Sequence, residues 1–465
     1  MKKTFSLPAL LLLASLPLTA TATDLYWEAG ADGLFSDTAA WTPGNTVPGT
    51  SDTAINASEY TVTINADWGM QNIKSANITA DEATAARFLQ TSGAVTVSNW
   101  FHLGEDSGSI GIYEITGGTL DANASVTDSA VRIGGNGLGI LKISGEGTIV
   151  NIAPDSDGWG NAFRIGNGGG MYSGGEGWVI QEGGTVNAGR VLIGQDSGGQ
   201  GSYSLSGGTL NSSGDAYVGG YNGTGTFTIT GGTFSGKKLH VSHEGGTGTF
   251  SMSNGEVSLS SWFIVGHKTG TSGGTGTATI SGGIFNANYQ SAVGNELGTG
   301  TLNITGGTLN AASYLCIGRQ GGTGTINITG GAINQNGGAF VLGGDTITGN
   351  SSGTAHHSAG TLNSMVDIKI GADNSTNKGI YNLSGSGEIH MTNGWLSLGN
   401  KGSEGVLNMT GGSFSYDASL AAGTSRISIG DGKKKDGATY TEGTINQSGG
   451  TFTATGVDTN IGGNG

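Results

Sequence analysis

Apolar and polar residues alternate in short runs along most of this chain. Between Thr226 and Thr230, Phe227 and Ile229 alternate with threonines, and Leu302 and Ile304 take the same places in a later copy. A period of two is typical of β-strands with one buried face and one solvated face. The pattern therefore predicts many short strands with Phe227 and Ile229 inside and the threonines outside.

Glycines separate these runs in a fixed order. A Gly-Gly pair follows many of the alternating runs and allows a tight corner at positive φ, after which Phe234, Leu309 or Ile333 turns inward again. Each unit then closes on an apolar residue that is followed by glycine, or by Ser242 in one copy. The fourteen aligned apolar positions are Leu103, Ile133, Ile165, Ile193, Val218, Val241, Val265, Val293, Ile317, Leu342, Ile370, Leu398, Ile429 and Ile461.

The spacing of these positions defines the fold class. It runs from 23 residues, between Val218 and Val241, to 32 residues, between Ile133 and Ile165. One such unit cannot bury its apolar face alone, so successive units must stack. We expect an all-β, elongated β-solenoid (a parallel β-helix) of about 14–16 turns with roughly 24–28 residues per turn. At about 4.8 Å per turn, fourteen turns make a rod of roughly 65 Å.

The first residues have the composition of an export signal. "MKK" is basic, "LPALLLLASLPL" (Leu7–Leu18) is apolar, and the following small residues offer a cleavage site after Ala22. We therefore divide the chain into a signal peptide (1–22), an N-terminal capping segment (23–60) and a solenoid domain (61–465). No later run reaches about 18 apolar residues, so we expect no transmembrane helix in the mature chain.

The opening of the mature chain carries a family resemblance. "YWEAGADGLFSDTAAWTPGNTVPGTSDTAIN", Tyr26–Asn56, contains Trp41, "VPG" at Val47–Gly49 and "DTA" at Asp52–Ala54, and "SGGTL" or "ITGGTL" turns follow. This arrangement resembles secreted bacterial proteins with autotransporter-associated β-strand repeats, many of which end in a PEP-CTERM sorting tail. The resemblance implies a β-helical rod that is exported through a Sec-type signal peptide, at the cell surface, outer membrane-associated or extracellular in a Gram-negative bacterium. Its role in that group is adhesive or structural.

The end of the sequence departs from that group. It stops at "IGGNG", Ile461–Gly465, whereas the same letters at Ile133–Gly137 continue into another strand. We expect the solenoid domain to be truncated there, so that the C-terminal anchor is not seen.

The charge and composition of the chain restrict its possible binding partners. Charged residues make up 11% of the 465 positions, and the net charge is −15. This balance argues against nucleic acid and against anionic membrane surfaces as partners. With the resemblance above, the expected partner is an extracellular polysaccharide, a matrix or another cell surface. The single cysteine, Cys316, excludes an internal disulfide framework and is assigned no role.

We considered catalysis because β-helical rods also carry polysaccharide lyases and hydrolases. Such chemistry needs converging carboxylates or a metal site, but the acidic residues here are spread about one per turn. The candidate metal ligands are His243 and His267, which hold the same place in adjacent turns, with Glu244 nearby. Other turns place Asn295, Arg319 or Gln195 in that column, which favours a tolerant polar corner. We therefore expect no catalytic residues, no bound metal and no cofactor.

Two binding alternatives remain open. Four aromatic residues, Trp100, Trp262, Tyr314 and Trp395, each stand four positions before the aligned glycine and are expected to point outward, where they would stack on sugar rings. A T-G-T phrase also recurs from Thr224 to Thr325, which raises ice binding, although the insertion "KTGTSGG" at Lys268–Gly274 is expected to spoil a regular array. The preferred function is an exported, non-enzymatic structural or adhesive rod. A polysaccharide-binding or polysaccharide-degrading protein and an ice-binding solenoid are the alternatives.

Overall fold

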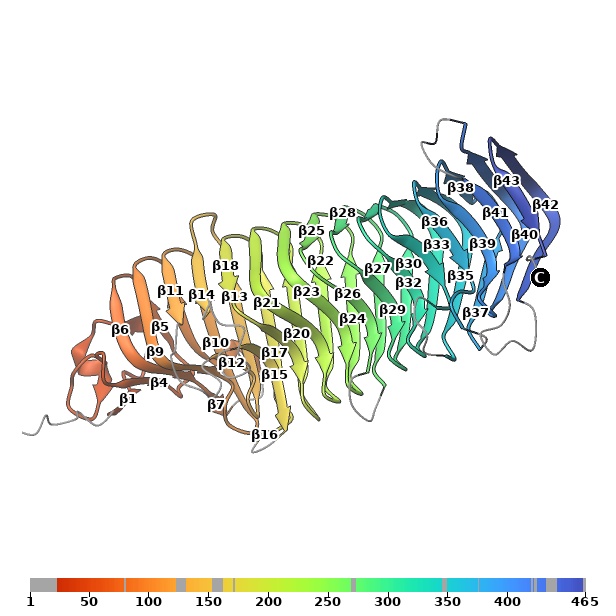
Figure 1. The fold of residues 1–465 in the computed structure, drawn as a ribbon. Coiled ribbons are helices and arrows are strands. Elements are labelled where there is room, and N and C mark those ends of the chain that lie inside the picture. Colours follow the sequence, from red (N-terminus) through yellow and green to blue (C-terminus); the bar gives the residue numbers. More distant parts are fainter. Residues whose placement is uncertain are drawn as a thin grey trace, which may run out of the picture.

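The chain winds into one elongated β-solenoid. The computed structural model describes residues 23–78, 81–122, 131–152, 162–169, 172–268, 273–344, 349–374, 376–419, 421, 425–431 and 441–462. The solenoid has about 14 turns of about 26 residues, with 64% strand and 2% helix, which confirms the predicted fold class. Figure 1 shows β1 (Asp24–Trp27) at one end of the rod and β42 (Glu442–Thr455) at the other. The predicted signal peptide, 1–22, and the final 463–465 lie outside the described residues.

Each turn contributes one strand to each of three parallel stacks, which we call the first, second and third sheets. In one turn these strands are β27 (Thr275–Ile280), β28 (Ile284–Ala287) and β29 (Ser291–Asn295). They pair in parallel with β30 (Thr299–Ile304), β31 (Thr308–Ala311) and β32 (Leu315–Arg319) of the next turn. Every turn is thus the template on which the next one pairs.

The remaining strands follow the same scheme, and some long strands run through a corner and serve two sheets. The first sheet also contains β2 (Gly33–Leu34), β5 (Thr61–Ile64), β8 (Ala86–Gln90), β10 (Ser109–Ile115), β13 (Leu138–Ile143), β17 (Glu176–Gln181), β20 (Gln200–Leu205), β22 (Thr224–Ile229), β24 (Thr247–Met252), β37 (Lys378–Leu383) and the opening parts of β33 (Thr323–Gln335), β35 (Ser352–Ser364), β40 (Glu404–Asp417) and β42. The second sheet also contains β11 (Thr119–Ala122), β14 (Ile149–Ile152), β18 (Thr185–Ala188), β25 (Glu256–Leu259), β38 (Glu388–Met391), the opening parts of β6 (Trp68–Ser75), β9 (Ala94–Leu103), β21 (Thr209–Gly220) and β23 (Thr233–His243), and the closing parts of β33, β35, β40 and β42. The third sheet also contains β1, β4 (Thr53–Asn56), β12 (Val131–Ile133), β15 (Phe163–Gly169), β19 (Val191–Gln195), β26 (Phe263–His267), β34 (Ala339–Leu342), β36 (Asp367–Ile370), β39 (Trp395–Asn400), β41 (Arg426–Asp431), β43 (Asp458–Ile461) and the closing parts of β6, β9, β21 and β23. The pieces outside these stacks are β3 (Trp41–Thr42), β7 (Asn77–Ile78), β16 (Tyr172–Ser173) and the short helices η1 (Thr38–Ala40) and η2 (Glu82–Thr84).

The core runs along the inside of the three sheets. Phe227 and Ile229 are 1% and 0% exposed, whereas Thr228 between them faces outward, which confirms the predicted alternation. Twelve of the fourteen aligned apolar positions, from Leu103 to Leu398, are also buried. Ile461 is 73% exposed because no described turn stacks on it. The predicted Gly-Gly corner is confirmed as well, since Gly307 adopts a φ of 66° before Leu309 turns into the core.

Aromatic side chains fill the N-terminal end of the core. Trp27, Phe35 and Trp41 are at most 2% exposed, and the Trp41 indole N–H donates to the carbonyl of Phe35 at 2.9 Å. Strand β1 pairs antiparallel with β3 and parallel with β4, so this segment joins the solenoid ladder. Trp41, one of the residues that carry the family resemblance, therefore packs inside the protein.

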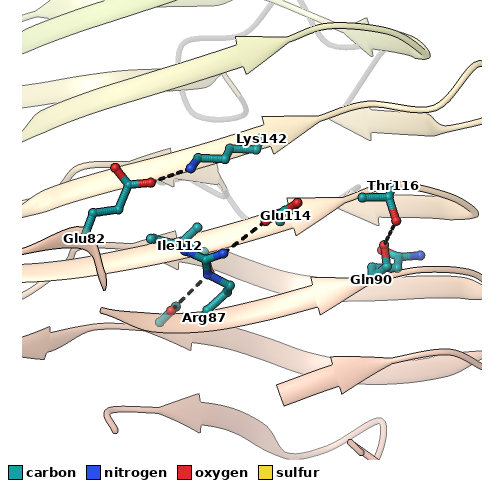
Figure 2. Close-up of polar contacts among 8 residues, drawn as sticks. Glu82, Arg87, Gln90, Ile112, Glu114, Thr116 and Lys142 are labelled. Atoms are coloured by element: carbon teal, nitrogen blue, oxygen red, sulfur yellow. Dashed lines mark hydrogen bonds and ion pairs between the residues drawn. The ribbon is translucent and has the colours of Figure 1, made fainter. Parts of the chain in front are cut away.

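Polar side chains on the outer faces link one turn to the next. Amide groups form a ladder on the second sheet, where Asn310 donates to Asn286 at 2.8 Å and Asn334 donates to Asn310 at 2.9 Å. Nearer the N-terminus, Arg87 Nη1 lies 3.3 Å from Glu114 Oε2 and Lys142 pairs with Glu82 (Figure 2). These contacts help to fix the register between turns.

His357 and Tyr381 form a buried polar pair within the core. The Tyr381 hydroxyl lies 2.9 Å from Nδ1 of His357, and His357 Nε2 lies 2.9 Å from the carbonyl oxygen of Gly360. Burial lowers the pKa of His357 and raises that of Tyr381. His357 thus has a structural place in the core with both ring nitrogens partnered. Among the described residues, no helix is long and apolar enough to cross a membrane.

Candidate functional site

Three histidines meet on the outer side of the third sheet. His240 and His243 belong to the closing part of β23, and His267 ends β26 in the next turn. The backbone N–H of Glu244 donates to the carbonyl of His267 at 3.2 Å, so His243 and His267 lie in the same column of adjacent turns. Their ring centroids are 5.1 Å apart. The structure brings together the two histidines that the sequence singled out.

His240 joins this pair although the sequence analysis did not place it there. Strict alternation would put His240 and His243, three residues apart, on opposite faces of a strand. Ser242 lies between them with a φ of 74°, at the bend where other turns have glycine, and its hydroxyl donates to the carbonyl of Gly246 at 2.8 Å. This bend carries His243 to the outer side, 5.6 Å from His240 between ring centroids. The sequence feature that could have revealed this bend is Ser242, which stands where the other aligned apolar residues are followed by glycine.

The three rings are buried and point polar atoms at one another. His240, His243 and His267 are 5%, 5% and 6% exposed, and one ring nitrogen of each lies within 4.8 Å of the others. Both nitrogens of His240 and the Nδ1 atoms of His243 and His267 are buried without a hydrogen-bond partner. Buried polar groups are normally partnered, as His357 is here. The cluster therefore has donor atoms that the protein itself does not use.

The surroundings of the cluster are aromatic on one side and charged on the other. The Tyr217 ring stacks on His240 with centroids 4.8 Å apart. Glu296 Oε2 lies 3.5 Å from His267 Nε2. A cavity of about 190 Å³ opens beside these groups, and its walls include His240, His267, Trp262, Glu296 and Arg319. Small ligands or ordered water thus have space next to the histidine rings.

Burial keeps these imidazoles uncharged at neutral pH. It is the largest cause that lowers the pKa of His240 and of His243, and neighbouring histidines lower both further. The pKa of His243 falls to about 4. Burial also lowers the pKa of His267, while the Glu296 carboxylate acts in the opposite direction. Neutral imidazole is the form that binds metal ions.

We expect the metal-free protein to lose stability in mild acid because of this cluster. The unfolded histidines bind protons below about pH 6.5, whereas folded His243 resists protonation until about pH 4, so the free energy of unfolding falls as the pH drops through this window. Denaturant titrations at pH 7 and pH 4.5 should show that wild type loses on the order of 2 kcal/mol more than His243→Gln. His390→Gln is the control, because the side chain of His390 is 44% exposed, and its loss of stability between pH 7 and pH 4.5 should equal that of wild type. An identical pH dependence for wild type and His243→Gln would contradict this expectation.

Glu244 does not converge with the histidines. It lies at a corner with a φ of 44°, and its carboxylate is not one of the atoms within 4.8 Å in the described cluster. Its charge still raises the pKa of His267. The Glu296 carboxylate, from the following turn, lies 3.5 Å from the ring of His267.

The four aromatic candidates do not form an open row. Trp100 stacks on His102 with centroids 4.7 Å apart, the Arg319 guanidinium lies 5.1 Å from the ring of Trp262, and that of Arg426 lies 5.5 Å from Trp395. The three tryptophans are half-buried, and neighbouring side chains cover part of each ring. Of the four, Tyr314 alone is exposed, at 36%. Neighbouring side chains cover rings that the strand alternation placed outside.

The threonine array is more regular than the sequence suggested. Strands β24 and β27 pair Thr247 with Thr275 and Thr249 with Thr277, so the insertion between these turns leaves the register unchanged. The expectation that this insertion spoils the array is wrong, because a loop can leave the ladder at a corner without shifting it. The outermost column consists of Thr224, Thr247, Thr275, Thr299 and Thr323, all exposed.

A second hollow lies where the second sheet meets the third. It has a volume of about 620 Å³ and crosses four turns. Most of the residues around it are serine or asparagine, with one lysine, and they include Asn211, Ser235, Lys237, Ser258 and Asn288. Cys316 lies elsewhere, 1% exposed against Ala339, Val341 and Ala372.

Comparison with known proteins adds no relative. No family model matches this sequence, and no curated protein or solved structure matches it either. The likeness to autotransporter-associated repeat proteins thus rests on the opening segment and the glycine turns alone. The architecture that follows from the chain itself is a parallel β-solenoid rod.

Proposed function

We propose that this protein is an exported, non-enzymatic rod at the surface of a bacterium or outside it, with a structural or adhesive role. The observation that carries the proposal is the unbroken solenoid, in which the same three-strand turn recurs from β1 to β43. Such stacking provides length and lateral contact area, which are the properties that a spacer or an adhesin needs. The basic and apolar start of the chain and its resemblance to autotransporter-associated repeat proteins also favour this role.

Export is tested by fractionating a Gram-negative host that expresses the full chain. We expect the protein outside the cytoplasm with residues 1–22 removed. Leu12→Arg interrupts the apolar stretch and should leave the uncleaved chain in the cytoplasm, whereas Thr228→Ser in the solenoid should not affect export. Wild-type protein that stays uncleaved in the cytoplasm would contradict the proposal.

Adhesion is tested with beads coated with the mature chain. Binding to cells or matrix polysaccharide above the level of albumin-coated beads supports the adhesive form of the proposal, and the hollow near Ser235 is the surface to change first. Incubation of the same protein with acidic and neutral polysaccharides tests the enzymatic alternative. Shortened polysaccharide chains would overturn the non-enzymatic assignment.

Ice binding is a second candidate because the threonine columns stay in register over five turns. Their hydroxyl and methyl groups repeat about every 4.8 Å between turns and about 6.6 Å along a strand, which is a regular surface for ordering water. If this array binds ice, the mature chain should show thermal hysteresis that Thr249→Tyr abolishes and Ser235→Tyr on the second sheet preserves. Wild-type protein without thermal hysteresis would eliminate this candidate.

A further inference from the structure

We propose that His240, His243 and His267 form a binding site for a divalent transition metal ion of the Zn²⁺ class. The first support is convergence, since one ring nitrogen from each residue lies within 4.8 Å of the others. The second is independent of that distance: His240 is 5% exposed, and neither of its ring nitrogens has a partner. Three of the seven histidines of the chain meet at this place.

The donor set selects the kind of ion. Imidazole nitrogen suits zinc, copper, nickel and iron, whereas calcium and magnesium prefer oxygen ligands. No thiolate contributes, because the single cysteine, Cys316, packs with Ala339, Val341 and Ala372 instead. Three histidine ligands with a fourth position left for water or another ligand are a common zinc arrangement.

The ring nitrogens must move closer together to hold one ion. Two nitrogens bound to one tetrahedral Zn²⁺ at about 2.0–2.1 Å from it lie roughly 3.3 Å apart. The distances between the ring nitrogens, which are at most 4.8 Å, must therefore shorten by up to about 1.5 Å. We expect the rings to turn about their Cβ–Cγ bonds when the ion binds, because these torsions are broad for histidine.

Neighbouring groups supply the outer shell of the site. Glu296 Oε2, 3.5 Å from His267 Nε2, is placed to orient that ring or to occupy the fourth position. On the other side, Tyr217 stacks on His240, and its hydroxyl lies 3.4 Å from Asp215. The cavity of about 190 Å³ borders His240 and His267 and gives the ion an entry path. The site does not depend on the rod being exported or adhesive.

The test uses the mature chain without a polyhistidine tag, because such a tag binds metal itself. After treatment with a chelator and dialysis, the protein is titrated with ZnCl₂ by calorimetry and with CoCl₂ by visible absorption. We expect one Zn²⁺ per chain, the visible bands of tetrahedral Co²⁺, and a higher melting temperature with zinc. A wild-type protein with none of these responses would overturn the proposal.

Variants locate the site. His267→Gln and His240→Phe should weaken zinc binding at least about 100-fold, and Glu296→Gln about 10-fold, since loss of an outer-shell partner alone commonly costs 10 to 100-fold. His390→Gln is the matched control, because the side chain of His390 is 44% exposed, and this variant should bind zinc as wild type does. If His240→Phe does not fold, the zinc affinity of His267→Gln and the absorption spectrum of Co²⁺ in the wild-type protein still test the proposal. Unchanged zinc affinity in folded His267→Gln would also overturn the proposal.

Discussion

Ile229→Asp should destabilise the middle of the rod by about 4 kcal/mol or more. Ile229 is 0% exposed and stacks between Leu205 and Met252 of the adjacent turns. An aspartate there would bury a carboxylate among apolar side chains with no cation to pair with it. Because each turn contacts only its neighbours, we expect the loss to appear first in the turns that contain β20, β22 and β24.

Hydrogen exchange with mass spectrometry measures that loss turn by turn. Peptides from these three strands should exchange faster in Ile229→Asp, while peptides near the two ends keep their wild-type rates. Thr228→Asp is the matched control, because Thr228 lies one residue away on the solvent side, where its hydroxyl accepts from Ser251 at 3.2 Å. It should cost about 1 kcal/mol or less. Equal effects of the two substitutions would show that the inward and outward faces have been assigned wrongly.

Gly300→Ala should cost about 3 kcal/mol although it adds a single methyl group. Gly300 is buried near the start of β30, where the first sheet passes close to the bend that ends the third sheet. An added Cβ would lie 2.1 Å from the carbonyl oxygen of Val265 and 2.4 Å from the backbone nitrogen of Gly294. Both atoms belong to the backbone, so the ladder itself must move to relieve the contact.

Gly147→Ala is the control for this effect. Gly147 is exposed, and a Cβ there would meet nothing within 4 Å. Its substitution should leave stability unchanged or raise it slightly, since alanine reduces the freedom of the unfolded chain. Thermal unfolding followed by far-ultraviolet circular dichroism compares the two variants with wild type. A Gly300→Ala protein as stable as Gly147→Ala would mean that adjacent turns are not as close as the structure has them.

The regular part of the candidate surface could be predicted from the sequence, but the irregular part could not. The T-G-T phrases located the threonine columns, and the matching positions of His243 and His267 placed those residues in one column. The phrases did not reveal why the central glycine is needed, because the close approach at Gly300 involves the backbone of another turn. His240 was not grouped with this pair for a related reason, since the positive φ of Ser242 breaks the alternation on which the assignment of faces relied.

The sequence by itself determined the strands, the corners and the inward faces, because a period of two and a glycine at each bend are local properties that every turn repeats. Only the tertiary structure decided which outward side chains meet. Stacking brings Arg319 over Trp262 and Glu296 to His267 across turn boundaries, and it keeps Thr247 opposite Thr275 in spite of the insertion between them. These contacts depend on the register between turns and on the path of each corner, which are set by packing over the whole ladder rather than by any one segment.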